Sequence, residues 1–507
     1  MKFVARRPLI LSLLFVLALA CQACTNAALQ MLQSQFDSNP NSPGGSTGGS
    51  GGTDKGGTGS LQGPSNLYYA WTNFVFTQNV QIAPAFPEYS GGTPTSYTIT
   101  PSTLPNGLFF DSSTGGIYGQ PSGPPQGNTS YELQAINQYG TAALEFNISI
   151  EADDSFRSWT DTPTIPTPTT GVAVAPLFFG GSALIIGGST AAIGATAATW
   201  IYNMSGPINV GPNLNIGRSQ MTATVLQTGA ILVAGGVDAS GNYLSSAELY
   251  DPSMNIFTML GSTMSSGRAG HTATLLEDGT VLLVGGYDGK NVLASADIFN
   301  PETNQFTPAM GTLNVARNGH AATLMGNGNV LITGGTDVNG NPYSTGEVYN
   351  MPTGGFSMLG SIMSSVRANH ISVALPNGQV LVALGASGSY GSGLVTNAAD
   401  IYDPIEQTFT PTGSAITAAY GSTGILLPNG EVLVVGGAIE GCTPAQASEL
   451  YNPTTGEWTP TTSTPSYPVN GQAGALLTNG AAFIAGGVNF DCGGDPDPQI
   501  PNTSFFQ

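Results

Sequence analysis

The segment DGTVLLVGG at residues 278–286 joins a turn signal, a short apolar run and a glycine doublet. Asp-Gly favours a two-residue hairpin turn because both positions adopt φ > 0, and the apolar run is typical of a buried strand. Similar runs recur along the 507-residue chain at spacings of 48 to 52 residues. This period predicts one four-stranded propeller blade per repeat. The runs end at Gly187-Gly188, Gly235-Gly236, Gly285-Gly286, Gly334-Gly335, Leu384-Gly385, Gly436-Gly437 and Gly486-Gly487.

The remainder of the repeat follows each doublet in a fixed order. A variable loop leads to a predicted third strand with an acidic and an aromatic residue, and a predicted fourth strand contributes another aromatic residue. The third strands contain Glu248 and Tyr250, Asp297 and Phe299, Glu347 and Tyr349, Asp400 and Tyr402, and Glu449 and Tyr451. The fourth strands contain Phe257, Phe306, Phe356, Phe409 and Trp458.

These motifs resemble the kelch repeat, and in particular the seven-bladed kelch propeller that is also the central domain of galactose oxidase. The resemblance covers residues 153–507 and implies an all-β fold. The last repeat reaches only its third strand, at residues 503–507, and residues 156–162 resemble the missing fourth strand. We therefore expect these two segments to pair in one blade and to close the ring, so that no sheet edge stays open.

A second β domain is expected at residues 67–152, where alternating apolar runs at 96–99, 131–136 and 143–150 are separated by Gly and Pro. The motifs LPNGL at 104–108, TGGIYGQP at 114–121 and NQYG at 137–140 resemble the "Putative Ig" (cadherin-like) domain of bacterial surface proteins. The resemblance implies an Ig-like β-sandwich. The segment contains no Cys or His, so we expect a spacer or adhesive role.

The N-terminus reads as an export signal. Residues 1–20 have a basic start and an apolar run, and Ala-Leu-Ala precedes Cys21, which resembles a bacterial lipobox. We expect lipidation of Cys21 and attachment to the outer membrane or cell surface of a bacterium; ordinary cleavage and secretion is the alternative. Residues 21–66 are expected to form a flexible tether, because residues 37–66 are rich in Gly, Ser, Thr and Pro and contain almost no apolar residues.

Charge and cysteine usage narrow the possible partners. The formal net charge is −20, and without the signal 7 basic residues face 30 acidic ones, so binding to nucleic acid is not expected. Cys442 and Cys492 each follow the second glycine of a doublet by five residues, in neighbouring repeats. We expect a disulfide between them in an oxidising compartment; two unrelated thiols are the alternative.

Arginine and histidine recur at fixed repeat positions, which favours a role in blade packing over a metal or substrate site. The arginines are Arg218, Arg268, Arg317 and Arg367, and the histidines are His271, His320 and His370. Every repeat with the arginine also has the third-strand acid, Glu248, Asp297, Glu347 or Asp400. We therefore expect a repeated ion pair.

Few side chains outside the repeat positions could catalyse a reaction. Acid–base chemistry would depend on loop carboxylates such as Asp491, and Asp495 with Asp497 is a weak calcium signal. The histidine count does not match the copper site of galactose oxidase, so we expect no cofactor, no metal and no enzymatic activity.

The sequence favours a monomeric binding or adhesion lipoprotein whose membrane contact is the lipid anchor alone. Its ligand, a protein or a glycan, is expected on the face that carries the long, variable loops between strands two and three and between strands four and one. The alternative is a secreted carbohydrate-active enzyme or lectin of galactose-oxidase-like architecture.

Overall fold

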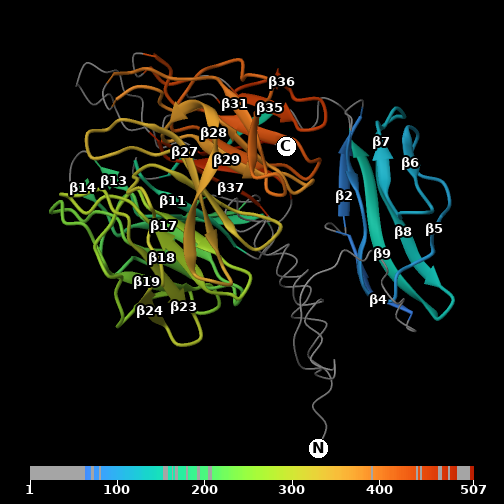
Figure 1. The fold of residues 1–507 in the computed structure, drawn as a ribbon, viewed down its shortest axis with the longest axis horizontal. Coiled ribbons are helices and arrows are strands. Elements are labelled where there is room, and N and C mark those ends of the chain that lie inside the picture. The colour runs from blue at the N-terminus through green and yellow to red at the C-terminus, as the bar shows by residue number, and fades with distance from the viewer. Residues whose placement is uncertain are drawn as a thin grey trace, which may run out of the picture. The chain divides into compact units, whose positions relative to one another are not determined.

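The computed structural model contains two compact units, which divide between residues 156 and 157, and every regular element described is a β-strand (Figure 1). It describes residues 63–69, 73–78, 82–151, 158–162, 164–165, 170–177, 181–190, 194–203, 208–389, 392–440, 443–445, 448–465, 471–477, 480–487 and 503–506.

The first unit contains two main sheets. One has the order β2 (Asn73–Thr77), β9 (Gly140–Glu151), β8 (Gln126–Asn137) and β5 (Ser96–Thr100), and β2 runs parallel to β9. The other has the order β3 (Ile82–Ala85), β7 (Ile117–Gly119) and β6 (Leu108–Phe110), while β1 (Pro64–Tyr68) pairs with β4 (Glu88–Gly91). The three runs expected from alternation lie within β5, β8 and β9.

An aromatic cluster occupies the core of this unit. Tyr69, Phe74 and Phe146 pack edge to face, with ring centroids 5.1 to 5.7 Å apart. Rings in this arrangement add to the stability gained from burial alone. The Tyr69 hydroxyl donates to the Gly115 carbonyl at 2.6 Å, so its polar group stays satisfied inside the core.

The second unit consists of seven four-stranded antiparallel sheets within the described residues, together with the short pair β13 (Ser189–Thr190) and β14 (Gly194–Ala195). Blades I to III are β11 (Ala173–Leu177), β12 (Ser182–Ile186), β15 (Thr199–Asn203) and β16 (Asn209–Val210); β17 (Thr222–Val225), β18 (Ile231–Ala234), β19 (Ala247–Asp251) and β20 (Ile256–Met259); and β21 (Thr272–Leu275), β22 (Val281–Val284), β23 (Ala296–Asn300) and β24 (Gln305–Pro308).

Blades IV to VII follow the same order. They are β25 (Ala321–Leu324), β26 (Val330–Thr333), β27 (Tyr343–Asn350) and β28 (Gly355–Arg367); β29 (Ile371–Ala374), β30 (Val380–Ala383), β31 (Ala399–Asp403) and β32 (Thr408–Pro411); β33 (Thr423–Leu426), β34 (Val432–Val435), β35 (Ser448–Asn452) and β36 (Glu457–Pro460); and β37 (Ala473–Leu476), β38 (Ala482–Ala485), β39 (Thr503–Phe506) and β10 (Trp159–Thr162).

The blades form a closed ring around their first strands. Each first strand contacts the first strand of the next blade, and β37 of blade VII contacts β11 of blade I. In blade VII, β10 pairs with β39 from Trp159 opposite Phe506 to Thr162 opposite Thr503. The two segments therefore share one blade, as their sequences predicted.

The glycine doublets bring neighbouring blades close together. Gly285 and Gly286 have φ of 62° and 95°, a backbone region that residues other than glycine rarely adopt. A Cβ atom on Gly285 would lie 2.7 Å from both the Arg317 carbonyl oxygen and His320 Cε1 of the next blade. The doublet therefore fixes both the end of the second strand and the distance between blades.

Blade V departs from this rule at Leu384, a buried leucine with φ of 66°. The next blade has Ser422 where His320 and His370 stand in their blades, so its smaller side chain leaves room for the leucine. Leu384 packs in the same apolar cluster as Ala399, Ala415 and Leu426. At the interface of blades V and VI, leucine thus replaces the glycine, and serine replaces the histidine, of the two preceding interfaces.

Candidate functional site

Each repeated arginine forms a buried ion pair with the acid on the third strand of its own blade. The side chains are at most 1% exposed. The N–O distances are 2.9 Å for Arg218–Glu248, 2.5 Å for Arg268–Asp297, 2.8 Å for Arg317–Glu347 and 2.6 Å for Arg367–Asp400.

In blades II to V the ion pair also holds the ends of the strands on the loop face. Arg268 Nη1 also donates to the carbonyls of Gly285 and Ser295, both at 3.0 Å, at the end of strand two and before strand three. Burial lowers the pKa of Arg367 to about 10, and the nearby Asp400 carboxylate opposes that shift, so the guanidinium remains charged. These four arginines are committed to the scaffold and are not available to a ligand.

The acid also accepts hydrogen bonds from the loop that precedes the first strand of its blade. The donor lies three positions before the arginine, and it is asparagine where the acid is glutamate and serine where the acid is the shorter aspartate. Asn215 donates its backbone and side-chain N–H groups to Glu248 Oε2, at 2.7 and 2.8 Å. Ser265 donates its backbone N–H and its hydroxyl to the shorter Asp297, at 3.0 and 2.9 Å. Asn314 with Glu347 and Ser364 with Asp400 repeat the two arrangements. The sequence alone did not lead us to this pairing, although Asn and Ser alternate at the position three residues before the arginine in the same order as Glu and Asp on the third strand.

The histidines lie between blades and do not converge. Nε2 of His271, His320 and His370 shares a hydrogen bond with Thr222, Thr272 and Thr333, at 3.2, 2.9 and 2.8 Å. Burial, reinforced by the neighbouring arginine, lowers the pKa of both His271 and His320 to about 3. They are therefore neutral at physiological pH. Within the described residues, no group of three His, Cys, Asp or Glu side chains could hold a metal ion.

A cavity of about 410 Å³ lies among the first strands. Small uncharged side chains such as Ala223, Ala321 and Ser422 line most of it, together with His370. The side chains that line this cavity include few that could donate or accept a proton.

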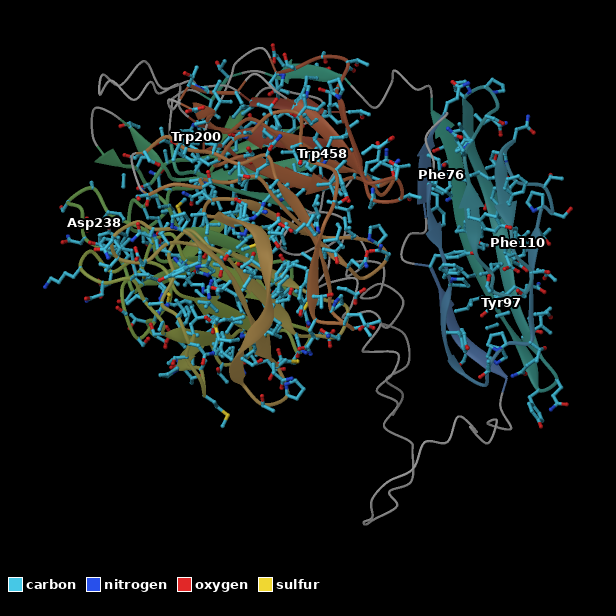
Figure 2. The ribbon with its side chains drawn as sticks, turned by 45° about the horizontal axis from the view of Figure 1, so that its top comes forward. Phe76, Tyr97, Phe110, Trp200, Asp238 and Trp458 are labelled. Atoms are coloured by element: carbon cyan, nitrogen blue, oxygen red, sulfur yellow. The ribbon has the colours of Figure 1, made fainter. Side chains whose placement is uncertain are left out.

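The loops between strands two and three carry a repeated aspartate turn. Asp238 accepts the backbone N–H of Ser240 and of Asn242, at 2.8 and 2.9 Å, and Asn242 Nδ2 donates to its second oxygen at 2.9 Å. Figure 2 labels Asp238 in this loop. Asp288 and Asp337 make similar turns in blades III and IV, and hydrogen bonding lowers the pKa of all three carboxyl groups. The turns present ordered loops to solvent.

Several predicted sites lie outside the described residues. These are Cys21, the pair Cys442 and Cys492, and the carboxylates Asp491, Asp495 and Asp497. Within the described part of the chain, no helix has the length and apolar character that a membrane span requires.

Comparison with known proteins agrees with this architecture. Residues 64–151 match the family model "Putative Ig domain", and residues 218–264 and 268–311 match the "Kelch motif". The protein thus combines a Putative Ig domain with a kelch propeller. A search of curated proteins gave no match.

The solved structures that are similar to the chain include the following two. A fungal alcohol oxidase of the AA5 family, in complex with copper, shares 18% identity over 69% of this chain and 76% of its own, with a TM-score of 0.54. The protein described as "Structure of YjhT" shares 17% identity over 59% of this chain and 99% of its own, with a TM-score of 0.47. Identity at this level establishes the shared fold only.

The described residues do not reproduce a copper site. Copper in such proteins needs nitrogen and oxygen ligands that converge on one point. Here each histidine contacts a threonine at a different blade interface. The three histidines therefore do not converge on a common metal position.

Proposed function

We propose that this protein is an envelope-anchored binding or adhesion protein, and that its propeller binds a ligand through the loops between strands two and three. The observation that carries the proposal is the contrast between scaffold and loops. The four repeated arginines are paired with acids inside blades II to V, whereas the loops between strands two and three expose apolar side chains such as Val338 and Leu394. Variable loops on a rigid scaffold are where binding commonly resides.

Blades IV and V supply the best-defined part of this face. Val338 and Leu394 are 66% and 49% exposed in adjacent loops, and Ser389 Oγ donates to Asn341 Oδ1 at 3.3 Å between those loops. A ligand that covered both loops would bury these two apolar side chains and gain the free energy of their removal from water.

The test uses the full mature chain on an array of glycans and matrix proteins. We expect Val338→Ser with Leu394→Ser to weaken binding at least about tenfold. The control is Ile405→Ser, which removes an apolar side chain that is 87% exposed in the turn between strands three and four, on the opposite face. Equal loss in both variants, or no loss in either, would contradict the proposal.

The anchor is tested separately. Lipidation at Cys21 predicts that the protein fractionates with membranes and that Cys21→Ser releases it to the soluble fraction. A soluble wild-type protein would favour secretion, and stoichiometric copper or calcium in the purified protein would favour the enzyme or lectin alternative.

A further inference from the structure

Blade VI keeps the third-strand acid but lacks the arginine that accompanies it in blades II to V. Glu449 on β35 is only 5% exposed, and Ala419 occupies the arginine position. The backbone N–H groups of Ile416 and Thr417 donate to its two oxygens, at 2.8 and 2.7 Å. Among the described residues, none pairs a positive charge with this carboxylate.

The surroundings of the missing guanidinium have changed with it. In blade V, Arg367 donates to the Leu384 carbonyl at 3.2 Å; in blade VI, the equivalent Gly436 carbonyl accepts from Ser422 Oγ at 2.9 Å. In blade IV, the Tyr343 ring covers Arg317, with 5.5 Å from ring centroid to guanidinium carbon. Ala445 takes the position of Tyr343 in blade VI. Its backbone N–H donates to the Gly437 carbonyl, as the Tyr343 N–H donates to the Gly335 carbonyl in blade IV. The same position holds Leu244, Leu293 and Thr396 in blades II, III and V. Blade VI therefore has alanine at the arginine position and the smallest of these side chains at the position beside it.

A buried carboxylate without a cation is costly, and two backbone N–H groups use only part of its acceptor capacity. The loops at this end of the propeller also favour cations. Outside the buried pairs, Lys290 is the one basic residue in the described part of the propeller, whereas Asp238, Asp288, Asp337 and Glu440 lie in the loops of the same face. A field of this sign draws positively charged groups towards the loops.

We propose that Glu449 forms a cation site that accepts a guanidinium group from the ligand, in the position that arginine occupies in blades II to V. The ligand would then be a protein that inserts an arginine side chain, and Ile416, whose backbone N–H donates to Glu449, has an exposed side chain that this protein would contact. This inference rests on the proposed function only in placing the ligand on the loop face.

The experiment measures binding of methylguanidinium, an arginine side-chain analogue, to the full mature chain by calorimetric titration, with sodium chloride at equal ionic strength as the reference. We expect saturable binding to the wild type, at least about tenfold weaker binding to Glu449→Gln, and none to Ala419→Arg, which would supply its own guanidinium. Arg317→Ala, which opens an equivalent vacancy beside Glu347, serves as the positive control.

Each outcome decides the proposal. Binding that is retained in Glu449→Gln and Ala419→Arg would place the cation elsewhere and overturn it. Binding to Arg317→Ala without binding to the wild type would show that blade VI is closed. The absence of binding to both would show that such a vacancy does not recruit a guanidinium, which also overturns the proposal. Because the probe is not the macromolecular ligand, these results are independent of whether the array experiment finds a partner.

Discussion

Arg317 holds a charge that the fold has removed from water, and its removal would leave Glu347 buried with no counter-charge. We expect Arg317→Ala to lower the free energy of unfolding by about 3–5 kcal/mol, the usual cost of breaking a buried pair by removing one partner. Calorimetric melting of the full chain measures the effect. The exposed Lys290 provides the control, since Lys290→Ala should change stability by less than about 0.5 kcal/mol. Equal effects of the two substitutions would mean that the buried pair adds nothing to stability.

His320 makes stability depend on pH. Its folded pKa is about 3 because of burial first and Arg317 second, whereas an unfolded histidine titrates near 6.5. Between these values the unfolded chain binds a proton that the folded chain does not. The histidine contribution is therefore complete above about pH 6.5 and declines as the pH falls, by about 1.4 kcal/mol per pH unit for each such histidine.

Glutamine is a suitable replacement, because Gln472 fills the same position in blade VII and donates to the Val435 carbonyl. From pH 6 to pH 5, His320→Gln should lose about 1 kcal/mol less stability than the wild type. Denaturant unfolding at the two pH values measures the difference. An identical pH dependence in both proteins would show that His320 is not a buried neutral side chain.

At the scale of strands and blades, Leu384 and Ser422 form a coupled pair across the interface of blades V and VI. Leu384→Gly should destabilise the protein, since the cavity left by a buried leucine, about 2–5 kcal/mol, outweighs the relief of its left-handed backbone, about 1–2 kcal/mol. Ser422→His should also destabilise it, because the histidine would meet the leucine side chain.

The double variant restores the arrangement of blades III and IV, where a Cβ atom on Gly285 or Gly334 would lie 2.7 Å from the histidine Cε1. We expect the double variant to be more stable than the sum of the two single effects by at least about 1 kcal/mol, measured in a double-mutant cycle. Strict additivity would mean that the two changes arose independently.

How far the sequence predicts the structure also differs between elements. The second strands could be placed because Asp278-Gly279, the run Val281–Val284 and the doublet agree at every level, and the structure buries all four strand residues. The pairing of Asn215 with Glu248 was not foreseen, since it joins residues that are distant along the chain through hydrogen-bond geometry. That Glu449 stands in a repeat without the arginine could be read from the sequence, whereas its burial and its two backbone donors required the structure.

At the scale of the whole molecule, ring closure depends on blade VII, whose outer strand comes from the start of the propeller and whose other three strands come from its end. β39 lies between β38 and β10, so one short strand joins residues more than 300 positions apart in sequence. Phe506 is buried, packs against Trp159 with ring centroids 5.3 Å apart, and belongs to the same apolar cluster as Ile425 of blade VI. Closure therefore combines backbone pairing with a core shared by two blades.

We expect removal of residues 503–507 to abolish the cooperative melting transition of the propeller, because β10 loses its partner and β38 becomes an open sheet edge. Phe506→Ala, which keeps the backbone pairing, should lower the free energy of unfolding by about 3–5 kcal/mol. Calorimetry of the full chain measures both, and the Ig-like unit, which has its own core, should still melt as in the wild type. Deletion of residues 37–62 from the predicted tether is the matched control and should leave the propeller transition unchanged. A propeller that melts at the same temperature without residues 503–507 would show that blade VII does not depend on the strand that joins its two ends.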